Sequence, residues 1–335
     1  MTNREVTYPE KGDEIPLDSN ENFLLPDEYY EGIKEDMDFN VSEYPSPSGK
    51  RLKKKLADFY DLHINQIVVG NGSDAILDTI YKTIIPEGGI IACYEPSYEM
   101  YGFFARRNER KFIEIPLTPS FTVPTHTDFL EEVDGLILCS PNNPTGISVD
   151  RNHLSSLLES GVPVIVDEAY AEYSSQNYIE LIHDYSNLII VRTFSKAWGL
   201  AGARIGYSIS SDEMGVDILS NMLPYNVNTL SLSAACSALD RKEIVKEAVQ
   251  KTTDEREYLE SELEDMGFNP ISSETNFVFA RVPAGVDTRE LYENLLEEGI
   301  RIRVFDEEKL ENYIRVTVAT KEINDMFLDS VEALI

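Results

Sequence analysis

The chain is poor in cysteine and in basic residues. Its 335 residues contain 3 cysteines, and 29 lysines and arginines stand against 60 aspartates and glutamates. Cys93, Cys139 and Cys236 lie far apart in mostly apolar surroundings without metal-ligand or redox spacing, which predicts buried, reduced thiols. The formal net charge of -31 would repel nucleic acid and anionic membranes, so we expect neither as a partner.

Long apolar runs are also absent. No stretch has the roughly 18 apolar residues of a membrane span, and the polar N-terminus lacks the apolar core of a signal peptide. We therefore expect a cytoplasmic protein. Neither a GxGxxG nor a Walker signature occurs, which argues against a dinucleotide or a nucleoside triphosphate. The 42% hydrophobic content still permits a large core, and the length predicts one large and one smaller domain.

The chain does contain short apolar runs that alternate with helical patterns. This alternation predicts a mostly parallel sheet with helices on both faces. A long amphipathic helix is expected over 242–267, followed by a small α+β domain. We place the N-terminal arm and part of the small domain at 1–40, the large α/β domain at 41–235 and the small domain at 236–335. The expected strands of the large sheet begin near residue 66 and then cover 89–94, 111–115, 135–140, 163–170 and 188–193.

The stretch 191–207 (VRTFSKAWGLAGARIGY) carries the strongest chemical signal, and Lys196 lies at its centre. Thr193 and Ser195 precede this lysine and Arg204 follows it after two glycines, so the lysine lies among anion ligands. A lysine amine near a bound dianion can form a Schiff base with a carbonyl cofactor, and pyridoxal phosphate has both features. A strand-to-turn junction with a solvated lysine is the alternative.

Other polar residues follow the expected strands at their carboxyl ends, where ligands gather in parallel sheets. The turn at Gly70 and Gly72 leads into a helix N-terminus that can hold an anion, although plain capping by Ser73 or Asp74 is the commoner reason for such a turn. The residues at these strand ends are Ser73, Asp74, Tyr98, Asn143, Asp167, Tyr170, Thr193 and Lys196.

Seven motifs in one order make the chain resemble a known family. They are LDSNEN, GNGSDA, EPSYEMY, SPNNPTG, VDEAY, TFSKAWGLAGARIGY and YIRVTVAT, and they span nearly the whole chain. Together they resemble the fold-type I pyridoxal-phosphate aminotransferases of class I and II, most closely their histidinol-phosphate branch. The resemblance implies a large domain with a mostly parallel seven-stranded sheet, a smaller α+β domain, and a homodimer that uses pyridoxal 5'-phosphate, an amino donor and a 2-oxo acid.

The resemblance also implies roles for the cofactor ligands. Lys196 would bind the cofactor covalently, and Asp167 would pair with its pyridine nitrogen. Asn143 and Tyr170 would hydrogen-bond its phenolate oxygen, while Tyr98 would stack on the ring. The phosphate would be held by Ser73, Asp74, Thr193, Ser195 and Arg204, and by Tyr44 from the partner subunit. Each also has a plain structural alternative, such as a strand-end cap for Asp167 or core packing for the tyrosines.

Substrate recognition is the least determined part of the resemblance. Arg315 would bind the anionic end of the substrate, Arg303 would be a second arginine for a phosphate ester, and Asn22 would lie nearby. Phe23, Ala75 and Trp198 depart from the family pattern without removing a group that transamination needs. Histidinol-phosphate transamination is therefore preferred. Aromatic amino acid transamination, decarboxylation of a phosphoamino acid and a silent binding or regulatory protein are the alternatives.

Overall fold

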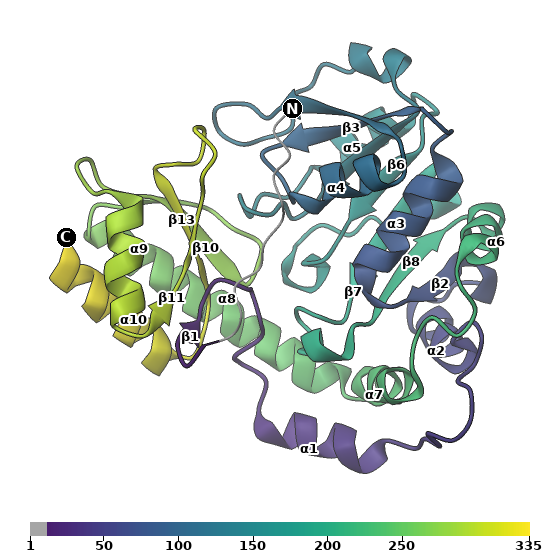
Figure 1. The fold of residues 1–335 in the computed structure, drawn as a ribbon, viewed down its shortest axis with the longest axis horizontal. Helices are drawn as coiled ribbons and strands as arrows, with labels where there is room; N and C mark the ends of the chain where they lie inside the picture. Colours follow the sequence, from purple (N-terminus) through teal and green to yellow (C-terminus); the bar gives the residue numbers. More distant parts are fainter. Residues whose placement is uncertain (1–11) are drawn as a thin grey trace.

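A computed structural model describes residues 12–335, so residues 1–11 of the expected N-terminal arm lie outside it. Its centre is a sheet of seven strands, six of which run in one direction (Figure 1). The pairs from β7 to β4 are parallel, whereas β8 is antiparallel to both of its neighbours. This confirms the mostly parallel sheet and adds β8, a strand that the sequence did not predict. The order is β2 (Ile67–Gly70), β8 (Gly206–Ser210), β7 (Leu188–Thr193), β6 (Val164–Asp167), β5 (Gly135–Cys139), β3 (Ile90–Glu95) and β4 (Lys111–Pro116).

Both faces of this sheet are buried because successive side chains of its strands are apolar on both sides. In β6, Val164 and Val166 pack into one core cluster, and Ile165 packs into another on the opposite face. The cluster around Ile165 includes residues of α3 (Gly72–Ile84), α4 (Met100–Arg107) and α6 (Asp212–Asn221). The other includes α2 (Lys50–Tyr60), α5 (Arg151–Leu158) and α7 (Thr229–Asp240). The helices therefore fix the strands from both sides and leave the strand ends for the site.

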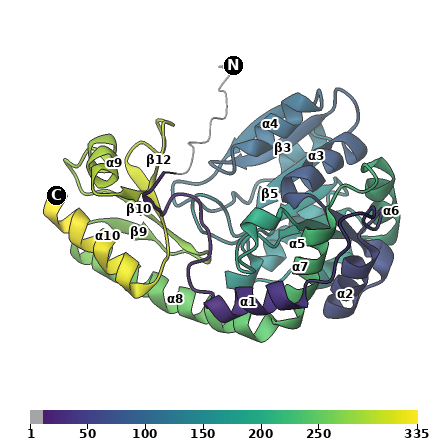
Figure 2. The ribbon, with the colours of Figure 1, turned by 60° about the horizontal axis from the view of Figure 1, so that its bottom comes forward.

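A second, antiparallel sheet of four strands forms the smaller part with its own apolar core. The segment β1 (Ile15–Pro16) pairs with β11 (Ile300–Arg301), which brings the start of the described chain into this part. The long helix predicted over 242–267 is confirmed as α8 (Lys242–Asp265), and both views show it running from α7 to the small sheet (Figures 1 and 2). The domain boundaries at residues 40 and 235 remain predictions. The other elements here are β12 (Arg303–Val304), β13 (Tyr313–Thr317), β10 (Phe277–Arg281), β9 (Asn269–Ile271), α9 (Thr288–Glu297) and α10 (Lys321–Leu334).

Within residues 12–335, five short 3-10 helices join the larger elements, and η3 and η5 lie closest in sequence to the predicted site residues. They are η1 (Ile64–Gln66), η2 (Asp128–Glu132), η3 (Ala171–Tyr173), η4 (Ile179–His183) and η5 (Ala201–Ala203). No helix within residues 12–335 is both long and apolar enough to cross a membrane.

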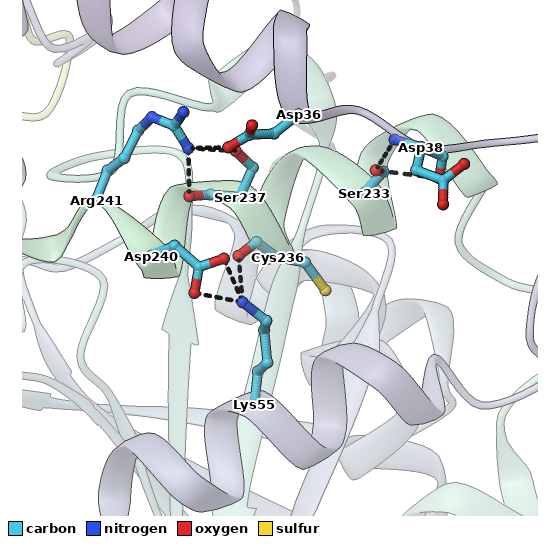
Figure 3. A network of polar contacts seen from close by, with 8 residues as sticks. All are labelled: Asp36, Asp38, Lys55, Ser233, Cys236, Ser237, Asp240 and Arg241. Atoms are coloured by element: carbon cyan, nitrogen blue, oxygen red, sulfur yellow. Dashed lines mark hydrogen bonds and ion pairs between the residues drawn. The ribbon is translucent and has the colours of Figure 1, made fainter.

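Helix α1 (Asp27–Asp36) is fastened to α7 by a polar network (Figure 3). The Arg241 guanidinium pairs with the Asp36 carboxylate at 2.6 Å and donates to the Ser237 hydroxyl. The Asp38 amide donates to the Ser233 hydroxyl at 3.1 Å. Lys55 of α2 reaches the same helix. Because α1 directly follows the segment 17–25, this network anchors the chain that enters the candidate site.

Candidate active site

The register of three neighbouring strands brings the glycine-rich turn beside the lysine loop. Gly70 of β2 lies opposite Gly206 of β8, and Gly206 lies opposite Thr193 of β7. A Cβ atom at Gly206 would lie 2.3 Å from the Ser73 amide nitrogen, far inside van der Waals contact. The start of α3 can therefore approach the end of β7 only because residue 206 is glycine.

This junction has the groups of an anion site. Asn71 at the N-cap of α3 makes no side-chain capping bond, so the helix N-terminus keeps its affinity for an anion. The buried hydroxyls of Thr193 and Ser195 lie 2.9 Å apart beside it. The Arg204 guanidinium lies 3.0 Å from the Asp74 carboxylate in the first turn of the same helix. Helix amides, two hydroxyls and a guanidinium together fit a phosphate group.

Lys196 lies next to this junction. Its Nζ donates to the Ser19 carbonyl at 2.9 Å and lies 5.8 Å from the centre of the Tyr170 ring. Burial, followed by the positive charges of Arg315 and Arg204, lowers the pKa of Lys196 to about 8. A lysine with so low a pKa is partly neutral near pH 7 and can act as a nucleophile or a base.

Asp167, at the end of β6, is a buried acid without a cation. Its side chain is almost fully enclosed and accepts hydrogen bonds from the Tyr101 hydroxyl at 2.9 Å and the Ala169 amide at 3.2 Å. Within the described chain it forms no ion pair, and burial raises its pKa to about 7. A carboxylate held there is suited to a ligand that supplies a positively charged nitrogen.

Arg315 of β13 links the small sheet to the large one. Its Nη1 donates to the Asn143 side-chain oxygen at 2.5 Å, and a second guanidinium nitrogen donates to the Asp18 carbonyl. Burial lowers the pKa of Arg315 to about 10. Its Nε is buried without a partner among the described residues, as expected of a guanidinium that also binds a ligand anion.

Arg303 faces Arg315 directly across the strand pair β12–β13. Directly opposed residues of an antiparallel pair share one face, so the two cationic side chains leave the sheet on the same side. Arg303 is 39% exposed in its side chain, and its Nη2 lies 3.6 Å from the Glu99 carboxylate. The buried Arg315 and the accessible Arg303 therefore form an inner and an outer cation.

Of the remaining predicted residues, some lie in the site and one does not. The Tyr98 hydroxyl lies 3.4 Å from the Asp74 carboxylate, and its ring contacts Tyr101, so it belongs to the site. Asn22 donates to the Ala197 carbonyl and accepts from the Leu24 amide, so it fastens the N-terminal segment to the lysine loop, and its predicted contact with substrate stays a prediction. Tyr44 is 84% exposed on the surface and is not among the residues brought together.

Two residues that contact the site were missed by the sequence analysis. Asn20 is buried with a φ of 56°, and its side chain donates to the Tyr170 hydroxyl at 2.9 Å. The backbone amide of Asn20 also donates to the Thr317 hydroxyl. Tyr101, the donor to Asp167, was likewise not singled out. The position of Asn20 within the motif LDSNEN is a weak signal for its role, whereas nothing in the sequence indicates that the Tyr101 hydroxyl points at Asp167.

The chain is similar to known proteins over nearly its whole length. The family model of aminotransferase class I and II matches residues 12–331. The histidinol-phosphate aminotransferase of Pyrococcus furiosus is 36% identical over 324 residues, covering 95% of this chain and 91% of that protein. The enzyme of the same name from Thermococcus gammatolerans is 35% identical, covering 96% and 92%. The crystal structure of the histidinol-phosphate aminotransferase from Clostridium acetobutylicum superposes with a TM-score of 0.87 at 26% identity, covering 96% of this chain and 98% of that chain.

Proposed function

Because the chain belongs to the class I and II aminotransferases, we propose that it transfers the amino group of histidinol phosphate to 2-oxoglutarate. Enzymes of this family depend on pyridoxal 5'-phosphate. The proposal on substrate is supported by the names of the relatives that are 30 to 36% identical over nearly the whole chain. It rests on one structural observation, the pairing of Arg303 and Arg315 across β12–β13.

The described residues fit the cofactor. The anion site at the start of α3, with Thr193, Ser195 and Arg204, would hold the phosphate of the cofactor. The Asp167 carboxylate, which has no cation partner among the described residues, would pair with the ring nitrogen of the cofactor and keep that nitrogen protonated. When bound, the cofactor withdraws electrons from the substrate α-carbon and so acidifies its C–H bond.

The remaining steps are carried by groups of this chain. With a pKa lowered to about 8, the Lys196 amine would take the proton from the α-carbon of the amino donor in one half-reaction and would supply a proton to the α-carbon of the new amino acid in the other. Arg315 orients the anionic end of the substrate beside Asn143, and the Tyr170 hydroxyl is held in place by Asn20. Burial of Asp167, Tyr170 and Arg315 excludes water and strengthens these interactions.

The two arginines explain how one pocket accepts two different anions. Glutamate presents a singly charged carboxylate, for which the buried Arg315 suffices as a bidentate partner. Histidinol phosphate presents a bulkier dianion, and Arg303 supplies the second positive charge from the accessible side. The Glu99 contact of Arg303 is long at 3.6 Å, so it is readily exchanged for a phosphate.

Replacement of Arg303 tests the substrate. Losing a charge-assisted hydrogen bond costs about 1.5 to 3 kcal/mol, so Arg303→Ala is expected to lower kcat/KM for histidinol phosphate roughly 10- to 150-fold and that for phenylalanine much less. Exposed Arg289 on α9 offers a matched control, because Arg289→Ala removes a charge of the same part of the chain. Equal losses for both substrates, or a wild-type enzyme that prefers phenylalanine, would contradict the histidinol-phosphate assignment.

We further infer that the enzyme is a homodimer with shared sites. Tyr44 is exposed, and the centre of its ring lies 5.0 Å from that of Tyr225. The two segments that carry these tyrosines, 39–44 and 223–225, hold further exposed apolar residues. An apolar surface of this kind is typical of a subunit interface. In the dimer, Tyr44 reaches the phosphate site of the partner. The cytoplasmic location and the lack of nucleic-acid and membrane partners remain predictions from composition.

A further inference from the structure

The four residues from Ser273 to Asn276 form a joint between the two parts of the molecule. We call them the 273–276 segment. The Glu274 amide donates to the Gly146 carbonyl at 2.8 Å, and the Thr275 carbonyl accepts from Arg256 of α8 at 2.8 Å. The Asn276 side chain donates to the Asn20 carbonyl at 3.0 Å. Glu274, Thr275 and Asn276 are therefore each hydrogen-bonded to a different part of the chain.

The Glu274 carboxylate collects four hydrogen bonds in this joint. Its Oε2 accepts from the Ser148 hydroxyl and from the Ser174 hydroxyl, the latter at 2.8 Å. Its Oε1 accepts from the Ser175 hydroxyl at 2.6 Å and from the Ser175 amide at 3.3 Å. Burial by itself would raise the pKa of Glu274, but the serine hydrogen bonds lower it overall. The cluster therefore holds a carboxylate anion between neutral donors.

Each segment bound by this carboxylate leads directly to a site residue. Ser148 ends the loop that carries Asn143. This loop is closed by a hydrogen bond from the Asn142 backbone amide to the Ile147 carbonyl. Ser174 and Ser175 follow Tyr170 after the single turn of η3. The loop and the 273–276 segment also meet closely, because a Cβ atom at Gly146 would lie 2.4 Å from the Ser273 hydroxyl.

The 273–276 segment itself leads to Arg315 through strand β10. Three residues after Glu274, strand β10 begins at Phe277, and Phe279 in it lies opposite Arg315 of β13. The Phe277 ring packs edge-on against Tyr170 at 5.3 Å and lies 5.3 Å from the Arg315 guanidinium. A displacement of the 273–276 segment therefore moves Phe277 and, through it, both Tyr170 and Arg315.

We propose that Glu274 is a positioning residue that fixes Asn143, Tyr170 and Arg315 relative to one another and so sets the affinity for the anionic end of the substrate. It contacts none of the three directly and acts through the loop, η3 and β10. This inference rests on the proposed function only in assigning the substrate anion to Arg315. Rigid support of this kind matters because small misplacements of site residues are costly in rate.

Glu274→Gln tests the proposal because it keeps the shape but changes the hydrogen bonding. An amide has one acceptor oxygen, and its NH2 group would face serine hydroxyls that now donate to Glu274. With the holoenzyme we expect kcat/KM to fall roughly 10- to 100-fold, mainly through KM, for histidinol phosphate and for glutamate alike. The visible absorbance of the bound cofactor should also titrate at a higher pH, because Asn143 and Tyr170 would hold its phenolate less firmly.

Two further variants complete the experiment. Ser175→Ala removes one hydroxyl from the cluster and should raise KM roughly threefold, which keeps the test valid if Glu274→Gln fails to fold. Glu297→Gln removes an exposed carboxylate on α9 and should change neither KM nor the absorbance titration. A lower Tm for Glu274→Gln with unchanged KM and unchanged absorbance would overturn the proposal. If the histidinol-phosphate assignment itself were wrong, wild-type enzyme would not use that substrate, yet the Glu274→Gln effect on glutamate would persist.

Discussion

At the scale of single residues, the buried carboxylate of Asp167 lowers the stability of the cofactor-free fold. A carboxylate with two hydrogen bonds and no cation is unfavourable in the interior, and burial raises its pKa from 3.8 to about 7. The folded chain thus binds a proton there that the unfolded chain does not bind between these pH values. Stability therefore falls as pH rises from about 4 to about 7. A protonated ring nitrogen of the cofactor would pair with this carboxylate and so offset the unfavourable free energy of burying it.

Asp167→Asn is expected to stabilise the cofactor-free protein while abolishing turnover. Asparagine keeps an acceptor for the Tyr101 hydroxyl but carries no charge, so at about pH 8 the free energy of unfolding should rise by about 1 to 4 kcal/mol. Urea unfolding of the wild type and the variant at about pH 8 and about pH 4 measures this. The difference should disappear at the lower pH. A variant less stable than wild type at about pH 8 would contradict this reading of Asp167.

At the scale of elements, the close approach of α3 to β8 builds the anion site. The approach depends on Gly206, whose missing side chain leaves room for the Ser73 amide. Thr193 lies opposite the same glycine, so one residue sets the distance between the helix N-terminus and the hydroxyls of the lysine loop. The strand β8 therefore positions the predicted phosphate ligands although it contributes none of them.

Gly206→Ala is expected to weaken cofactor binding. Its Cβ would force the start of α3 away, and such overpacking costs typically about 1 to 3 kcal/mol. Gly202→Ala is the matched control, because a Cβ there meets nothing within 4 Å and its φ is not positive. Equilibrium dialysis with pyridoxal phosphate and thermal unfolding should both separate the two variants. Equal cofactor affinity in both would show that the contact with Ser73 does not shape the site.

Most of these elements could be predicted, and the exceptions have physical reasons. The strands β3, β5, β6 and β7 are short apolar runs bounded by turns, and they were predicted within a few residues. Strand β8 was missed because its sequence GYSIS is short, holds two serines and continues a glycine-rich motif. Motifs located Lys196 and Asp167, but the contacts of Asn20 with Tyr170 and of Glu274 with Ser148 join residues more than 100 positions apart, which no local pattern reveals.

At the scale of the whole molecule, the placement of Tyr44 requires a second subunit if it is to serve a site. It is exposed and contacts Tyr225 on the surface, whereas the other predicted phosphate ligands lie together at the start of α3 and the end of β7. A shared site predicts that two defective subunits can complement each other. The dimer then holds one site that lacks both residues and one that has both.

Mixing an inactive Tyr44→Ala protein with an inactive Lys196→Ala protein is expected to restore activity. Random exchange makes half of the dimers mixed, and each has one intact site, so roughly a quarter of the wild-type activity should return. Exchange is confirmed by tagging one variant and isolating the mixed dimer. No activity in the isolated mixed dimer would show that Tyr44 serves its own subunit or none.

The half-reaction with histidinol phosphate, followed by the visible absorbance of the bound cofactor, tests amino transfer by this chain most directly. Wild-type holoenzyme is expected to lose its absorbance band on addition of histidinol phosphate and to recover it on addition of 2-oxoglutarate, with glutamate formed and no carbon dioxide released. Lys196→Ala should bind the cofactor without this cycle, because the proton transfer needs the amine. Release of carbon dioxide from a phosphoamino acid, or a full cycle in Lys196→Ala, would contradict it.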